Sequence, residues 1–96
     1  MTEEHVLRGD IFLVALNPTR GSEIRKTRPC VIVAPLTTGG HPYPFRVRCT
    51  FDGKNGHVVP DQLRAVDRER LVKHLGRLSD TALNELLGVL QAMFAV

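Results

Sequence analysis

The stretch that decides the fold runs from Arg8 to Pro29 and reads RGDIFLVALNPTRGSEIRKTRP. Its apolar run from Ile11 to Leu16 predicts a strand, which Asn17 and the proline after it end. A polar loop follows, and a second apolar run begins at Cys30. We expect the loop to present backbone N–H groups and cations to an anion. These cations are Arg20, Arg25 and Lys26.

Further strands are predicted on both sides of this loop, and each has its own pattern. The expected ranges are Gly9–Leu16, Pro29–Leu36 as a strand buried on both faces, Phe45–Phe51, His57–Val66 and Lys73–Leu78. Phe45–Phe51 alternates, with Arg46 and Arg48 on its outer face. Asp52–Gly56 predicts a hairpin turn, Thr38–Pro42 a loop, and Pro60 an edge or bulge in the returning strand.

The C-terminal segment predicts a helix. Ser79 is a natural N-cap, and apolar residues recur at helical spacing at Leu83, Leu86, Leu87, Leu90 and Phe94. Asp67 is suited to capping a short helical turn over Arg68–Leu71. Several short strands with one terminal helix predict a mainly β, α+β fold, built as a small, strongly bent sheet or partial barrel.

Length and charge limit the functions that the chain can have. Its 96 residues predict one domain over 1–96, with a loose leader over Met1–Leu7. From Asn17 to Arg48 six cations face only one carboxylate, Glu23, whereas Ser79–Val96 carries two carboxylates and no Lys or Arg. This asymmetry favours a face that meets an anion, although chance clustering on a solvated surface stays open.

No targeting or membrane-spanning pattern is visible, so we expect a cytoplasmic protein with two reduced, buried thiols, Cys30 and Cys49. The two cysteines are nineteen positions apart and no histidine stands at a ligand spacing, so no metal site is predicted, and no cofactor motif is present. His41 and His57 have the chemistry for acid–base work, but solvated loop positions are the more ordinary interpretation.

The remaining polar residues suit chemistry on a phosphodiester. RNA carries its own nucleophile, the 2′-OH, so a protein can cleave it by orienting that group and stabilising the charged phosphorane. An Arg fork binds phosphate in two places, and a Thr hydroxyl donates to a phosphate oxygen. Neither needs a metal. Because Arg stays protonated, electrostatic stabilisation is a better role for it than proton abstraction.

The chain resembles the MazF/PemK family of toxins, which are sequence-specific endoribonucleases of toxin–antitoxin pairs. The matching motifs are RGDIFLVALNPTRGSE, TRPCVIV, APLTT, YPFRV, VVPDQLRAVDRERL and LGRLSD, which cover most of the chain. The resemblance implies an SH3-like barrel of the PemK type, a homodimer, and metal-independent cleavage of single-stranded RNA. It also implies products with 2′,3′-cyclic phosphate and 5′-OH ends, no cofactor, and an acidic, MazE-like antitoxin that covers the basic groove.

The resemblance also assigns site residues. The catalytic Arg that precedes the Pro of the second strand corresponds to Arg28, and the catalytic Thr before the next loop corresponds to Thr37. RNA-binding positions would be Arg20, Gly21, Ser22, Glu23, Arg25, Lys26, Thr38 and Gln62. Asp61 and Gln62 would lie near the RNA groove and the dimer interface. Ordinary structural roles stay open: Arg28 as an ion-pair partner of Glu23, and Thr37 as a strand-end hydroxyl.

One departure from the family pattern affects the site. Family members have two separate strands, one after the Arg-Pro and one ending in the Thr, but this chain runs directly from TRPCVIV into APLTT. In one straight strand, Arg28 and Thr37 would lie about 30 Å apart at roughly 3.3 Å per residue, so one phosphate would not touch both.

Three explanations remain open for this departure. A connecting segment is missing between Val33 and Ala34, or the deletion is real and the protein holds RNA or antitoxin without cutting, or the site is completed across a dimer. A gyrase-targeting toxin of similar fold is a further alternative.

Overall fold

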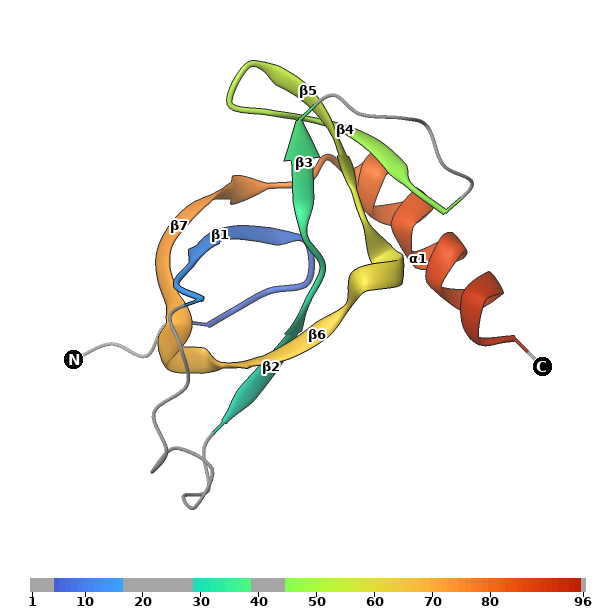
Figure 1. The fold of residues 1–96 in the computed structure, drawn as a ribbon. Coiled ribbons are helices and arrows are strands. Elements are labelled where there is room, and N and C mark those ends of the chain that lie inside the picture. The colour runs from blue at the N-terminus through green and yellow to red at the C-terminus, as the bar shows by residue number, and fades with distance from the viewer. Residues whose placement is uncertain (1–4, 17–28, 39–44, 96) are drawn as a thin grey trace.

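The computed structural model describes residues 5–16, 29–38 and 45–95. Within them it has seven strands, two single-turn 3-10 helices and one α-helix, arranged as Figure 1 shows. The strands are β1 (Asp10–Val14), β2 (Cys30–Val33), β3 (Leu36–Thr38), β4 (Val47–Phe51), β5 (Lys54–Val58), β6 (Arg64–Asp67) and β7 (Leu71–Arg77). The helices are η2 (Pro60–Gln62), η3 (Arg68–Arg70) and α1 (Asp80–Phe94).

The strands form three small antiparallel sheets rather than one. β1 pairs with β7, β2 with β6, and β5 lies between β3 and β4. The register of β1 with β7 shifts twice, between Ile11 and Phe12 and between Leu13 and Val14, so this pair is irregular. The strands curl around the middle of the molecule, and α1 lies along one side (Figure 1). The predicted bent, β-rich fold with one C-terminal helix is confirmed.

α1 begins where the sequence indicates. The Ser79 side chain accepts a hydrogen bond from the Ala82 backbone N–H at 3.1 Å, which satisfies one of the amides left open at a helix start. Ala82 is buried in the core with Ile11, Val47, Val58 and Leu78, and Leu83, Leu86 and Val89 pack against that cluster. The apolar stripe of the helix therefore covers the β4–β5 end of the fold.

The β4–β5 hairpin turns more tightly than the sequence interpretation allowed. Asp52 and Gly53 both have positive φ, 55° and 73°, which is the requirement of a two-residue turn of type I′. Strand β5 therefore already starts at Lys54, and the prediction that the turn extends to Gly56 is wrong. Pro60 does interrupt the chain, but the expected single strand His57–Val66 with an edge or bulge is wrong, because Pro60 opens η2 between β5 and β6, which belong to different sheets. Asp67 caps η3 by accepting from the Glu69 N–H at 2.9 Å, also as predicted.

The run Pro29–Leu36 is not one strand buried on both faces. It divides into β2 and β3 at Ala34 and Pro35, because proline has no N–H to give to a ladder. Ile32 is 68% exposed and Cys30 is exposed, so the expectation of burial was wrong for both residues. Phe45, expected on the core face, is also exposed. Thr38, expected in the following loop, ends β3.

Asp10 holds the first strand to the last one. Its carboxylate contacts Arg77 Nη1 at 3.2 Å and His74 Nε2 at 3.4 Å, and it accepts from the Leu7 N–H at 2.8 Å. Burial of this side chain, which is 7% exposed, raises its pKa. The Leu7 hydrogen bond and the two neighbouring side chains outweigh burial, so the pKa of Asp10 is lowered overall.

Candidate functional site

Thr37 lies in the middle of β3, where the sheet register gives it two polar neighbours. It is the register partner of His57 on β5, and His57 is in turn the partner of Arg48 on β4. Residues directly opposite one another in antiparallel strands share a face of the sheet. By register, Thr37, His57 and Arg48 therefore form one row across β3, β5 and β4. Thr37 also lines an apolar cavity inside the curl of strands, whereas His57 and Arg48 line a second hollow that does not include Thr37.

The hairpin turn sets this row. Because the loop has only two residues, Phe51 pairs with Lys54, and the count along both strands brings Arg48 opposite His57. On the other face the same count brings buried Val47 opposite buried Val58. The basic outer face of β4, predicted from alternation, is confirmed for Arg48, which is exposed. Arg48 was not among the predicted site residues, and the predicted turn over Asp52–Gly56 would not have placed it opposite His57.

The β3 backbone lies very close to β5 at Gly56. A Cβ added at Gly56 would collide with the Thr37 carbonyl oxygen and press on the Thr38 Cα. Only glycine therefore allows β3 to approach this part of β5. Gly56 sets where Thr37 lies, and the candidate site depends on a residue that has no side chain.

Among the described residues, the Thr37 hydroxyl has no hydrogen-bond partner. Its oxygen is shielded from solvent and makes no hydrogen bond, which is unusual for a buried polar atom. Such a group gains free energy when an acceptor is brought to it. Of the other predicted site residues, Thr38 is exposed at the end of β3, and Gln62 is exposed on η2 beside Asp61. The structure does not bring Gln62 into the row of Thr37.

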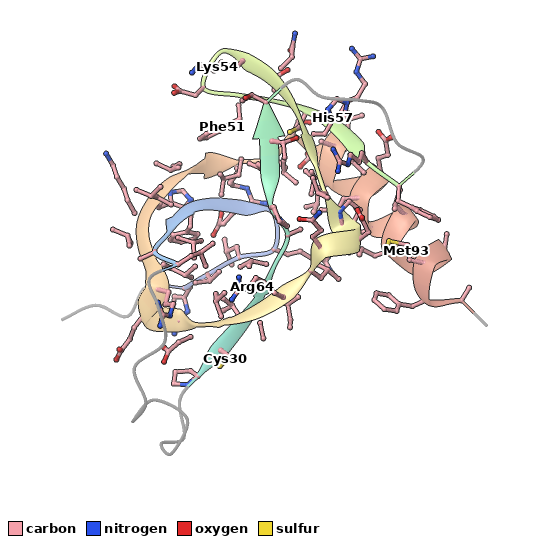
Figure 2. All side chains as sticks on the ribbon, in the orientation of Figure 1. Cys30, Phe51, Lys54, His57, Arg64 and Met93 are labelled. Carbon is pink, nitrogen blue, oxygen red and sulfur yellow. The ribbon has the colours of Figure 1, made fainter. Side chains whose placement is uncertain are left out.

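Most predicted site residues lie outside the described residues: Arg20, Gly21, Ser22, Glu23, Arg25, Lys26 and Arg28. Pro29, which follows Arg28, is described, and its carbonyl accepts from the Arg68 N–H at 2.9 Å. Thr37 pairs with His57 on β5, whereas β2 pairs with β6. Figure 2 shows Cys30 and His57 at opposite ends of the molecule.

Strands β2 and β3 pair with different sheets and not with each other. Pro29 and Thr37 are eight residues apart, so extended backbone would put at most about 26 Å between them. The described part of one copy therefore does not bring the start of β2 to Thr37.

The described residues also include groups that take no part in this row. Burial raises the pKa of the Cys49 thiol, which makes it a poor nucleophile. Across residues 5–16, 29–38 and 45–95, no group of three or more His, Cys, Asp or Glu side chains is arranged to hold a metal ion. In the same ranges no helix is long and apolar enough to cross a membrane.

A cavity of about 930 Å³ lies inside the curl of strands. Apolar side chains from β1, β2, β3, β7 and α1 line most of it, among them Val14, Val33, Leu36, Leu75 and Leu86. Its volume is at the upper end of the roughly 300–1,000 Å³ that ligand pockets occupy. The core of this chain is therefore incompletely filled by the residues that surround it.

Comparisons with known proteins agree with one another. A family model described as PemK-like, MazF-like toxin of type II toxin-antitoxin system matches residues 7–94. Endoribonuclease PemK of Escherichia coli is 36% identical over 90% of this chain and 80% of its own length. Endoribonuclease MazF9 of Mycobacterium tuberculosis is 30% identical over 82% of this chain and 87% of its own. Among solved structures, an endoribonuclease in complex with its cognate antitoxin, from a mycobacterial species, has a TM-score of 0.74 at 20% identity. That likeness covers 96% of this chain and 97% of the other, and it shows the shared fold.

The alignment with the Escherichia coli relative also shows a difference in length. It spans 108 positions, yet it contains 90% of a 96-residue chain, which is about 86 residues. About 22 aligned positions, 108 less 86, therefore have no residue in this chain.

Proposed function

The chain belongs to the PemK-like, MazF-like toxin family of type II toxin–antitoxin systems, and from this we propose that it is a toxin that cleaves RNA and is neutralised by a cognate antitoxin. Two relatives named as endoribonucleases support the activity, and a structural neighbour held in complex with its antitoxin supports the partner. The observation that carries the proposal to a site is the Thr37 hydroxyl, which has no partner and lies in one row with His57 and Arg48.

We propose that cleavage needs no metal and uses the RNA's own 2′-OH. The 2′ oxygen bonds to phosphorus, the bond from phosphorus to the 5′ oxygen breaks, and the leaving oxygen takes a proton. The products are a 2′,3′-cyclic phosphate and a 5′-OH end. Arg28 stabilises the charged phosphorane, and Thr37 donates a hydrogen bond to a phosphate oxygen.

We propose His57 as the group in the row that takes the 2′-OH proton, because an imidazole nitrogen can accept a proton and donate it again. Arg48, its register partner, contributes a positive charge to the same face.

Substrate binding in this proposal is electrostatic. The loop residues Arg20, Gly21, Ser22, Glu23, Arg25 and Lys26 approach the backbone of single-stranded RNA, with Thr38 and Gln62 at the edges of the groove. Such binding weakens steeply with salt. An acidic antitoxin segment competes for the same cations. We further propose that the protein works as a homodimer in the cytoplasm.

A second candidate function follows from the separation of Pro29 and Thr37. If Arg28 stays at the start of β2, no phosphate reaches both catalytic residues in one copy, and the chain binds RNA or antitoxin without cutting. The 22 unmatched alignment positions support the other explanation, a segment missing between Val33 and Ala34 that would separate the two strands. Completion across the dimer is the third arrangement.

The test is cleavage of a long single-stranded RNA by the purified protein in EDTA. We expect cuts with cyclic-phosphate ends, and a loss of about 100- to 1,000-fold in Arg28→Ala and Thr37→Ala, as for other groups that stabilise a developing anion. Thr50→Ala is the matched control, because Thr50 is an exposed threonine of β4 in the same sheet, and its hydroxyl bonds Asn55 at 3.3 Å. A folded protein that binds RNA without cutting it would favour the second candidate, and equal losses in all three variants would contradict the site.

A further inference from the structure

The outer face of the β4–β5 hairpin and the first turns of α1 enclose the second hollow, which has a volume of about 470 Å³. That volume is within the roughly 300–1,000 Å³ that ligand pockets occupy. Unlike the cavity inside the curl of strands, this hollow is lined largely by polar side chains. Apart from Ser79, whose hydroxyl caps α1, they are Arg48, Thr50, Asn55, His57, Thr81 and Glu85.

The floor of the hollow is a patch of four side chains on one face of the hairpin. The strand register pairs Arg48 with His57 and Thr50 with Asn55. The Cβ atoms of such cross-strand pairs lie about 5 Å apart, and alternate residues along one strand lie about 7 Å apart. The patch therefore has the dimensions of a single nucleobase. Glu85 stands beside it on the second turn of α1 and forms part of the wall.

Two charged groups in the hollow have no partner within the described part of the chain. Arg48 and Glu85 both line it, yet neither makes an ion pair or a hydrogen bond with another described residue. Asn55 Oδ1 accepts from the Thr50 hydroxyl at 3.3 Å, so Asn55 Nδ2 is the end of that amide that remains to donate. The hollow thus offers a cation, an amide donor and a carboxylate acceptor.

Among the four bases of RNA, guanine has the edge that complements these groups. Its N1–H and N2–H donors are adjacent and lie next to the acceptor O6, whereas the other bases lack donors at two adjacent positions. A carboxylate accepts two parallel hydrogen bonds. We propose that the hollow binds one guanine nucleotide of the RNA, with Glu85 accepting from N1–H and N2–H and Asn55 Nδ2 donating to O6. Arg48 contacts the phosphate of that nucleotide.

This inference deepens the proposed function and rests on it, because it takes RNA as the substrate. His57 lines the hollow and is also the register partner of Thr37. A nucleotide bound in the hollow therefore lies beside the phosphate that Thr37 contacts. A guanine held there would set which phosphodiester bond reaches Thr37, and this would make cleavage depend on sequence.

The test is an NMR titration of the isotope-labelled full chain with the 3′-monophosphates of guanosine, adenosine, cytidine and uridine. We expect the Asn55 side-chain amide to shift most with the guanosine compound, which should bind at least tenfold more tightly than the other three. Inosine 3′-monophosphate differs from it only by lacking the N2 amino group, so it should bind about tenfold more weakly than guanosine 3′-monophosphate.

Glu85→Gln separates base recognition from a general effect of charge. Removing a negative charge should favour every anionic nucleotide, but loss of the carboxylate acceptor should weaken the binding of guanosine 3′-monophosphate about tenfold. The other three nucleotides should bind this variant as tightly as the original protein or more tightly. Asp80→Asn is the matched control, because Asp80 is an exposed carboxylate of the same helix that does not line the hollow. It should change the binding of each nucleotide less than twofold.

Four results would overturn the inference. They are no shift of the Asn55 amide with any nucleotide, equal binding of all four, tighter binding of guanosine 3′-monophosphate by Glu85→Gln, and equal effects of Glu85→Gln and Asp80→Asn. Cleavage of RNA is measured separately, so the two proposals can fail separately. A chain that cuts RNA without preferring guanosine keeps the proposed function and loses this inference. A chain that prefers guanosine but cuts no RNA keeps the nucleotide site and loses only the cleavage.

Discussion

Gly56→Ala is the substitution that most directly tests how the fold positions Thr37. The added methyl group would collide with the Thr37 carbonyl oxygen, which belongs to the backbone and cannot rotate away. Strand β3 must therefore move outward from β5. Overpacking of this kind costs about 1–3 kcal/mol, so we expect the free energy of unfolding to fall by about 2 kcal/mol. For a domain of this size that lowers the melting temperature by about 8–16 °C.

The effect on activity should exceed the effect on stability. A displacement of about 1 Å at a catalytic group can cost around a hundredfold in rate. RNA cleavage measured at 20 °C, below the melting temperature of both proteins, should therefore fall by about that factor in Gly56→Ala. Denaturation curves run on the same samples separate loss of folded protein from loss of rate in the folded protein.

Gly53→Ala is the matched control for this prediction. Gly53 has φ 73° and nothing within 4 Å of an added Cβ, so alanine there costs about 1–2 kcal/mol of backbone strain without touching β3. Cleavage by the folded Gly53→Ala protein should stay within threefold of the original. If Gly56→Ala keeps its activity, or if Gly53→Ala loses as much, then Thr37 is not the group that Gly56 positions.

Three other substitutions test the fold. Asp10→Asn removes the charge that Arg77 and His74 contact, so it should lower stability by about 1–2 kcal/mol at pH 7. Because the folded pKa of Asp10 is lowered from the usual value near 3.9, its carboxylate stabilises the protein above that pH and loses its effect as pH falls through the folded pKa. The free energy of unfolding, measured by urea denaturation, should differ less between Asp10→Asn and the original protein at pH 3 than at pH 7. An equal difference at both pH values would contradict a stabilising role for the charged Asp10 carboxylate. Ser79→Ala should cost about 1 kcal/mol, since the Ala82 N–H loses its cap; a change under 0.3 kcal/mol would mean that water replaces it. Gly88→Ala, with nothing within 4 Å, should raise stability by about 0.5–1 kcal/mol, and destabilisation would show that α1 packs more tightly there.

Local sequence signals were sufficient wherever the structure depends on neighbours along the chain. Ser79 marked the helix start, Asp67 marked the short turn, and Pro60 marked the break between two strands, because each acts through its own backbone or the next few amides. Alternation over Phe45–Phe51 correctly predicted the exposed face of β4 at Arg48. The family resemblance was also available from the motifs, and the comparison with known toxins confirmed it.

Burial was harder to predict, because it depends on segments far apart in the chain. Cys30 and Ile32 were expected inside from their apolar neighbours, yet both are exposed, because burial alternates along β2 and these two residues lie on its outer face. The sequence also gave no reason to expect that Gly56 touches the Thr37 backbone, because that contact exists only once β3 pairs with β5.

The amino-acid sequence by itself determined the class of fold, the C-terminal helix, the presence of the β4–β5 hairpin and the family. Each of these follows from apolar periodicity, capping residues, turn residues and motifs that act over short spans of chain. Tertiary structure alone decided that Thr37, His57 and Arg48 form one register row, that β2 and β3 join different sheets, and that an apolar cavity lies inside the curl of strands. Those features are set by pairing between distant strands, and pairing depends on which edges and faces remain after the local elements have packed.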